Sequence, residues 1–170
     1  TLGNHAARTF EGAIGGPIGG DLLQGRVAAK IDERDGYGRN LATNAQIDDR
    51  KARAVRGSLR INASDAVTID LVGDYFDEDD YNYAFHYFGP TVVPEDALPH
   101  NLLGGQTIFD YYAPKKPNQR NIVSDLNPTN ERDGRSLTGI VDWTINDNWS
   151  LKSVTAWRDF NRFLQDDLDS

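Results

Sequence analysis

Residues 137–157 read LTGIVDWTINDNWSLKSVTAW, two alternating runs joined by a short polar segment. Successive side chains of a β-strand point to opposite faces of its sheet, so each run predicts a strand with one apolar and one polar face. Asn and Asp tolerate tight-turn geometry, and Asn146-Asp147-Asn148 therefore predicts an antiparallel hairpin. The apolar face carries Leu137, Val141, Trp143, Ile145, Trp149, Leu151 and Trp157.

The same period of two recurs upstream, in segments bounded by turn residues. Further strands are predicted around residues 10–18, 23–31, 55–62 and 67–75, which makes six strands in three hairpins. Tight turns at 19–21, 63–65 and 146–148 alternate with long loops at 35–49 and 79–132. The predicted fold class is all-β, with antiparallel strands.

Composition narrows the class of protein. The formal net charge of −8 argues against nucleic acid as a partner, because phosphate binding needs clustered Lys and Arg. The absence of cysteine excludes disulfides and thiolate zinc sites, and no run approaches the roughly 18 apolar residues of a membrane helix. The chain starts without Met and contains none, as expected of an internal fragment.

The asymmetry of the connections favours a transmembrane β-barrel over a soluble sandwich. Outer-membrane barrels have short periplasmic turns at one end and long external loops at the other. Trp149 and Trp157 lie on one face about 26 Å apart along the strand, or about 19 Å after a 45° tilt, which approximates the spacing of two interfacial girdles. The predicted girdle residues are Trp143, Trp149 and Trp157.

Several phrases resemble the early barrel strands of TonB-dependent receptors. They are EGAIGGPI at 11–18, GRVAA at 25–29, RDGY at 34–37, DDR at 48–50, VRGSLR at 55–60 and LKSVTAWRD at 151–159. Their order covers nearly the whole chain except the second long loop. The Gly-Pro strand end and the Arg-Asp-Gly-Tyr phrase are the more specific of these matches.

The resemblance implies a barrel of 22 strands around an N-terminal plug, in the outer membrane of a Gram-negative bacterium. Such receptors take up siderophores, vitamin B12 or carbohydrates, with energy relayed through TonB to the plug. Residues 1–170 are then expected to be a partial barrel domain without the plug and the remaining strands. Six strands cannot close such a barrel, and the expected partners are TonB, outer-membrane lipid and a small-molecule ligand.

The second long loop mixes acidic and aromatic residues at its start. The acidic run is Asp77-Glu78-Asp79-Asp80, and the candidate ligand-binding residues that follow are Tyr81, Tyr83, Phe85, His86 and Tyr87. Carboxylates suit calcium, and aromatic rings suit sugars or flat chelates, so one interpretation is ligand capture at the cell surface. The other is a solvated loop that packs on itself.

The polar face of the strands carries many charges. The residues expected to face the lumen are Arg56, Arg60, Asp70, Asp74, Asp142, Lys152 and Arg158. They either line a substrate path, because such barrels have polar interiors, or pair with one another across strands.

Two other functional classes remain as alternatives. A soluble secreted all-β module that binds carbohydrate or protein would bury the apolar faces in a closed core. An enzyme would need a convergent acid, base or nucleophile, and none is displayed. His5, His86 and His100 lack metal-ligand spacing, so no catalytic residue, metal site or cofactor is predicted.

Overall fold

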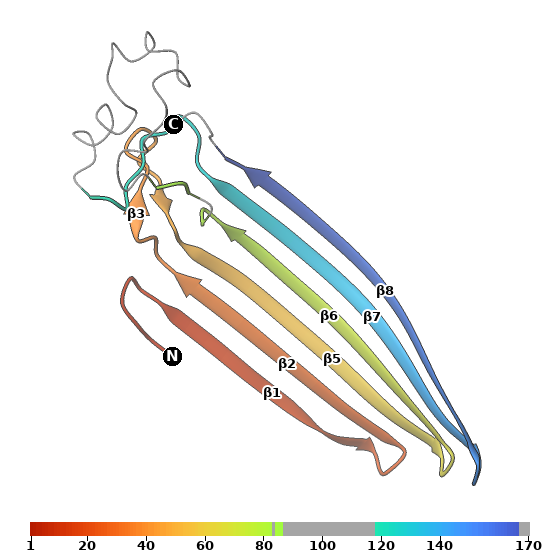
Figure 1. Cartoon of the computed structure of the whole chain (residues 1–170). Coiled ribbons are helices and arrows are strands. Elements are labelled where there is room, and N and C mark those ends of the chain that lie inside the picture. The colour runs from red at the N-terminus through yellow and green to blue at the C-terminus, as the bar shows by residue number, and fades with distance from the viewer. Residues whose placement is uncertain (83, 87–117, 167–170) are drawn as a thin grey trace, which may run out of the picture. The chain divides into compact units, whose positions relative to one another are not determined.

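The computed structural model describes residues 1–82, 84–86 and 118–166, and all of its regular structure is β (Figure 1). Six long strands form one sheet, and two short strands form a second. The long strands are β1 (Arg8–Gly19), β2 (Leu23–Arg34), β5 (Arg50–Ser64), β6 (Val67–Asp80), β7 (Thr129–Asn146) and β8 (Trp149–Gln165). The short strands are β3 (Gly38–Arg39) and β4 (Gln46–Ile47).

The long strands lie side by side in the order β1-β2-β5-β6-β7-β8 (Figure 1). Each strand therefore neighbours the long strands that precede and follow it in the chain. β1 pairs with β2, and β5 with β6, in antiparallel orientation. In the described part of the chain the sheet is open, with β1 and β8 at its edges. The prediction of an all-β fold with six antiparallel strands is confirmed.

The three tight turns lie at one end of the strands, called the turn end here, and the two long connections leave from the other, the loop end. The first turn needs Gly20, whose φ of 63° is in the left-handed region that favours glycine. Two other turns link β5 to β6 and β7 to β8 through two residues each, Asp65-Ala66 and Asp147-Asn148. The predicted turn positions are confirmed to within two residues.

The strands extend further toward the loop end than the alternation predicts. The predicted loop at 79–132 is too long, because β6 continues to Asp80 and β7 already begins at Thr129. The acidic run that was assigned to this loop is therefore the last part of β6. Arg132 of β7 donates from Nε to Glu78 Oε2 over 2.6 Å and so joins the two strands where no apolar face remains.

The chain divides into two compact units, of which the first holds most of the six-stranded sheet. The second contains residues of the two long connections and the C-terminal end, and its β3–β4 pair was not predicted. Among the described residues the only buried aliphatic or aromatic side chains, proline aside, are Ile47 and Ile122, both in this second unit. Its buried Asn40 donates to Leu126 O and Asn127 Oδ1 and accepts from the amides of Ala42 and Ser124. No helix in the described ranges has the length and apolarity needed to cross a membrane.

Candidate functional site

The register of the six strands defines rows of residues that run across the sheet. Val27 pairs with Ile14 and Gly57 pairs with Gly73. The amide of Asn62 donates to Leu22 O over 2.9 Å, and that of Thr144 donates to Ala66 O over 2.8 Å, which joins the three hairpins. Side chains of one row share a face, so the register divides the sheet into two faces. One such row contains Ile14, Val27, Gly57, Gly73, Leu137 and Trp157.

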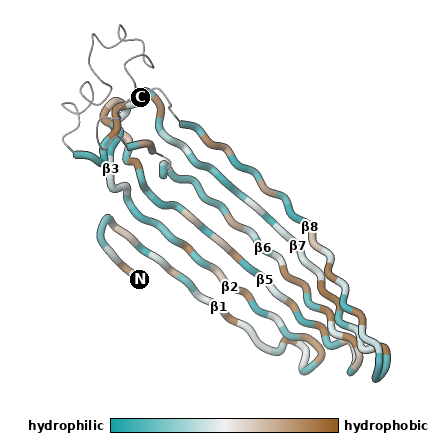
Figure 2. Tube along the Cα trace, in the orientation of Figure 1, coloured by the Kyte–Doolittle hydropathy of each residue, from teal (hydrophilic) through white to brown (hydrophobic). Residues whose placement is uncertain are grey.

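One face of the sheet is apolar and uncovered. Between the turns and the level of Ile31, Tyr75 and Trp157 it exposes fourteen large apolar side chains, and Figure 2 shows the alternation of polar and apolar residues that produces it. Covering a half-exposed side chain of this size gains about 1 kcal/mol, roughly half the value for full burial. The set is worth roughly 14 kcal/mol, comparable with the whole stability of a typical domain. These side chains are Phe10, Ile14, Ile18, Val27, Ile31, Val55, Leu71, Tyr75, Leu137, Trp143, Ile145, Trp149, Leu151 and Trp157.

The three predicted girdle residues all lie on this apolar face. Trp149 and Trp143 are near the turn end, whereas Trp157 is eight positions further along β8 from Trp149. Their exposed fractions are 44% for Trp143, 69% for Trp149 and 54% for Trp157. The structure therefore places them on one surface, at two separate levels.

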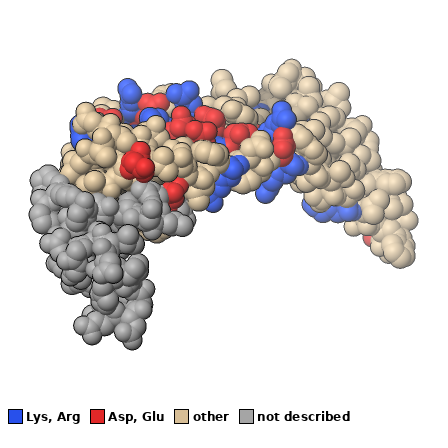
Figure 3. All heavy atoms as spheres, turned by 90° about the horizontal axis from the view of Figure 1, so that it is seen from above, with Lys and Arg blue, Asp and Glu red and all other residues tan. Residues whose placement is uncertain are grey.

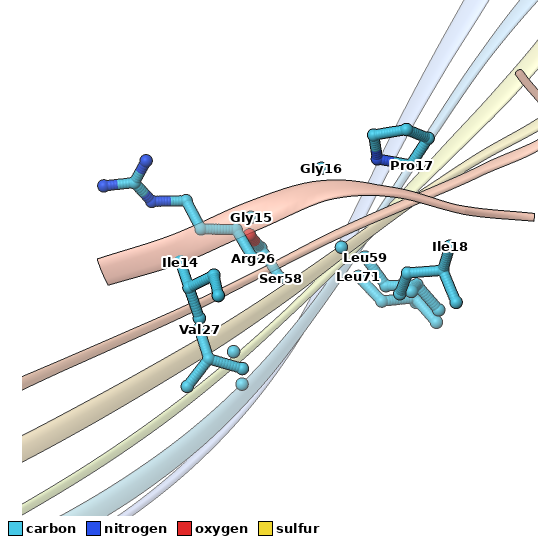
Figure 4. Close-up of a pocket in the computed structure, with 13 residues that line it drawn as sticks. Ile14, Gly15, Gly16, Pro17, Ile18, Arg26, Val27, Ser58, Leu59 and Leu71 are labelled. Atoms are coloured by element: carbon cyan, nitrogen blue, oxygen red, sulfur yellow. The ribbon is translucent and has the colours of Figure 1, made fainter. Parts of the chain in front are cut away.

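A shallow hollow of about 700 Å³ lies where β1, β2, β5 and β6 carry several glycines, and its lining includes residues of both parities, such as Val27 and Arg26. Gly16, Gly25, Gly57 and Gly73 contribute no side chains there. Apolar side chains flank it, and Figure 4 shows Ile18, Leu59 and Leu71 on one side of the strands and Arg26 on the other. The hollow is open over Gly57, where an added Cβ would meet no atom within 4 Å, whereas the Ile18 side chain occupies the space over Gly25.

The opposite face is charged, and its charges pair across neighbouring strands. Figure 3 shows positive and negative side chains interspersed on the surface in view. Arg60 donates to both carboxylate oxygens of Asp70, at 2.7 and 2.8 Å. Arg56 Nε lies 2.5 Å from Asp74 Oδ1, and Lys152 Nζ lies 3.1 Å from Asp142 Oδ1.

Six of the seven residues expected to face the lumen are thus cross-strand partners, as the pairing alternative predicted. The seventh, Arg158, shares their face on β8, and no ion pair is seen for it among the described residues. Ser136 adds a hydrogen bond of 3.2 Å to Asp74 Oδ2, which ties β7 to the same network. These pairs link neighbouring strands across the charged face.

An aromatic contact on the charged face was not predicted. The rings of Phe76 and Phe160 have centroids 6.1 Å apart, and Gly134 lies between them in the same row. A Cβ at Gly134 would lie 2.5 Å from Phe76 Cε1, so only glycine leaves room for this ring. The sequence indicated this contact only indirectly. Phe76 of β6 and Phe160 of β8 occupy positions whose side chains point to the polar face.

A further unpredicted feature borders the apolar face at the loop end. Each hairpin has an Arg on its first strand directly opposite a carboxylate on its second, and these are called the border pairs. Arg8 Nε lies 2.9 Å from Glu33 Oε2, and Arg135 Nη2 lies 2.9 Å from Asp159 Oδ2. In the middle hairpin Arg53 is the register partner of Asp77, and its Nη2 is 3.6 Å from Glu33 Oε1.

The border between apolar and charged residues runs obliquely across the strands. Relative to the row through Val27, the continuous run of apolar positions ends four residues further on β2 (Ile31), two further on β6 (Tyr75) and in the row itself on β8 (Trp157). On β8 one further apolar side chain of this face, Phe163, lies six residues beyond Trp157 and past the charged Asp159. From the first hairpin to the third, the border therefore moves toward the turn end by two residues per hairpin. At the turn end, the apolar positions of the three hairpins recede by similar steps.

The candidate ligand-binding residues of the second loop are described only in part. Tyr83 and Tyr87 lie outside the described residues. Within the second unit, His86 Nε2 is 2.9 Å from Asp48 Oδ2, and the amide of Tyr81 donates to Asp49 Oδ1 over 2.6 Å. Phe85 is exposed. These contacts attach the start of the second long connection to the end of the first.

In the described ranges no three or more His, Asp and Glu side chains come together as metal ligands. Comparison of the chain with protein-family models, curated proteins and solved structures gives no match.

Proposed function

We propose that this chain forms part of the wall of an outer-membrane β-barrel, in a transporter of the kind that the TonB-dependent receptors represent. The apolar face would contact lipid, and the charged face would line the interior. The function of the whole protein would be uptake of a scarce ligand such as a siderophore, vitamin B12 or a carbohydrate. Energy would come from TonB through a plug that these residues do not include.

The oblique border of the apolar face carries the membrane part of this proposal. Two residues rise about 6.6 Å along a strand, and two strands span about 9.6 Å across the sheet. A level that recedes by two residues per hairpin therefore makes an angle of about 35° with the rows. Strands of membrane barrels tilt by about 35–45°, so a level lipid surface would produce the observed border.

The height of the apolar face agrees with the same geometry. On the second strands of the three hairpins it spans Leu23 to Ile31, Val67 to Tyr75 and Trp149 to Trp157, nine residues each time. The eight steps between the first and the last of them extend about 26 Å along a strand and about 22 Å after a 35° tilt. The apolar band of an outer-membrane barrel is about 25 Å tall. A soluble module would have no reason to keep this length constant while shifting the level.

The transport part of the proposal rests on the resemblance to TonB-dependent receptors and on the polarity of the opposite face. A wall with lipid on one side and water on the other needs charges on its inner side only. Arg56, Asp74 and their neighbours supply these charges. Because these charges pair with one another, they would hold the strands of the inner wall together. The residues that contact the ligand would then lie on the loops.

Depth-dependent quenching of tryptophan by brominated phospholipids tests the membrane location. In a background with the three tryptophans replaced by Phe, a single tryptophan is placed at Leu71 or restored at position 157. We expect Leu71→Trp to be quenched most by bromines deep in the acyl chains, and Trp157 by bromines near the headgroups. Cooperative unfolding of the unmodified protein in plain buffer, without quenching in vesicles, would instead establish the soluble binding module.

A further inference from the structure

The two faces of the six-stranded sheet differ in net charge. Within the first unit, the strands place four basic and six acidic residues on the face with the apolar side chains, all of them beyond its border. They are Arg8, Lys51, Arg53 and Arg135, and Glu33, Asp77, Asp79, Glu131, Asp133 and Asp159. The charged face has nine basic and six acidic residues, a surplus of three positive charges in a chain whose formal net charge is −8. They are Arg26, Lys30, Arg34, Arg56, Arg60, Arg132, Lys152, Arg158 and Arg162, and Glu11, Asp32, Asp70, Asp74, Glu78 and Asp142. A surface of this kind favours an anionic partner.

Arg158 carries part of this surplus. It is one of two arginines on the charged face, with Arg26, that make no ion pair or side-chain hydrogen bond within the ranges that the structure describes. Its neighbour across the strands is Ser136, whose hydroxyl donates to Asp74 Oδ2 over 3.2 Å. Asp74 also accepts from Arg56 Nε, so this carboxylate is already engaged. The Arg158 side chain is exposed, and its donors are therefore available to a group from outside the chain.

A second hollow, of about 780 Å³, lies beside Arg158 and is called the arginine hollow. Its volume is in the range of small-molecule sites. Lys30 faces Glu11 over 3.9 Å and Arg56 pairs with Asp74, so Arg158 supplies the unbalanced charge. Five of the sixteen lining residues are strand neighbours whose side chains belong to the other face. The eleven on the charged face are Glu11, Ala28, Lys30, Ala54, Arg56, Asp74, Phe76, Gly134, Ser136, Arg158 and Phe160.

Two aromatic rings line the arginine hollow next to this charge. The Phe76 and Phe160 rings have centroids 6.1 Å apart and are tilted by 38°. Phe160 is two positions beyond Arg158 on β8, or about 6.6 Å along the strand. The register partner of Phe76 is Ala54, whose small side chain occupies little of the space beside the ring. A planar aromatic group can lie against these rings while its anionic substituent reaches the Arg158 guanidinium.

The arginine hollow lies at the level of the loop-side border. Arg158 directly follows Trp157, where the continuous apolar run of β8 ends, and Phe76 directly follows Tyr75, where that of β6 ends. In the proposed barrel this level is the part of the inner wall nearest the loops. A ligand that enters from the loop side would meet the arginine hollow before the paired charges closer to the turn end, such as Arg60 with Asp70.

We propose that the arginine hollow binds an anion with a planar aromatic ring, such as an aromatic carboxylate. The inference rests on the proposed function, because it names the ligand class of the same transporter. The carboxylate accepts hydrogen bonds from Arg158, and the ring lies against Phe160 and Phe76. A neutral carbohydrate would leave the charge of Arg158 without a counterion. The paired charges of this face keep their role between strands, which Arg158 does not share.

Ligand-observed saturation-transfer NMR of the protein in deuterated micelles tests the site, with micelles alone as the reference. The probes are benzoate, its uncharged analogue benzamide, and cyclohexanecarboxylate, which keeps the charge without the aromatic ring. We expect benzoate to bind about tenfold more tightly than benzamide, the effect of one charge-assisted contact. It should bind about threefold more tightly than cyclohexanecarboxylate, the effect of one aromatic contact. Equal affinities in either comparison would overturn the inference.

Variants separate the charge from the rings. Arg158→Gln is expected to abolish the preference for benzoate over benzamide. Phe160→Leu should weaken the binding of both compounds and leave that preference in place. Arg26→Gln is the matched control, because it removes the same charge from the other unpaired arginine of this face, outside the arginine hollow, and should not change the preference. If Arg26→Gln lowers the preference as much as Arg158→Gln does, the surplus charge acts over the whole face and the site assignment is wrong.

Circular dichroism checks that each variant keeps the strand signal of the unmodified protein. A folded Arg158→Gln protein that still prefers benzoate contradicts the assignment of the carboxylate. Quenching by brominated lipid together with equal binding of the probes would defeat this inference alone, whereas absence of quenching would defeat the proposed function as well.

Discussion

Val27 and Leu137 lie in one row of the sheet, and their exposed fractions are nearly equal, at 53% and 55%. The oblique border nevertheless puts them at different depths of the proposed membrane. Val27 is four residues from the last apolar position of β2 at either end, whereas Leu137 is itself the last apolar position of β7. Arginine substitutions at the two positions should therefore lower the free energy of unfolding by unequal amounts.

The size of the difference follows from the depth. Four residues correspond to about 13 Å along the strand and about 11 Å along the membrane normal at a 35° tilt. An arginine at the midplane of a membrane barrel costs about 2–4 kcal/mol, and one near the interface about 0–1 kcal/mol. We expect Val27→Arg to lower the free energy of unfolding by about 2 kcal/mol more than Leu137→Arg does.

Reversible urea unfolding in lipid vesicles, followed by tryptophan fluorescence, measures both values. Thr138→Arg places the same charge on the charged face next to Leu137, and as a control it should cost less than about 1 kcal/mol. Equal losses for Val27→Arg and Leu137→Arg would refute the tilted band. The exposed fraction of a side chain and its row in the sheet would then be sufficient to explain the loss in the free energy of unfolding. A larger loss at Leu137 would refute it as well.

Two further predictions concern contacts on the charged face. Gly134→Ala should lower the free energy of unfolding by about 1–3 kcal/mol because its Cβ would overlap the Phe76 ring, and a second change, Phe76→Leu, should recover most of this loss. Gly57→Ala is the matched control without a clash, and unchanged urea midpoints for both glycine variants would contradict the expectation. Arg132→Met should cost about 1.5–3 kcal/mol in the same assay, since Glu78, only 5% exposed, loses two short hydrogen-bonded contacts. A loss below about 0.5 kcal/mol would show that this pair behaves as an exposed one.

The strands were predictable where one of their faces is apolar. In residues 137–157 a period of two with large apolar side chains leaves only one assignment, and the turn residues between the runs set the hairpin. The same rule located β1, β2, β5 and β6. It failed beyond the border, because residues such as Asp77, Glu78 and Asp79 are polar on both faces and carry no alternation.

Contacts between strands explain what the sequence alone did not show. The ends of β6 and β7 are held by Glu78 and Arg132, whose residues are 54 positions apart in the chain. The β3–β4 pair consists of two residues on each side, too few for a periodic pattern. Its packing depends on Asn40, which bonds residues more than 80 positions away. Local periodicity cannot predict contacts between residues so far apart in the chain.

Local sequence patterns do not reveal the border pairs either. Arg8, Arg53 and Arg135 are unremarkable in the sequence, where each is one of many charges. Only the register aligns each with a carboxylate of its own hairpin, at levels that shift by two residues from hairpin to hairpin. A tilt is a relation among strands, and no single strand contains it. The sequence could therefore suggest a membrane barrel through resemblance and turn asymmetry, whereas the oblique level that supports that proposal physically depends on the sheet.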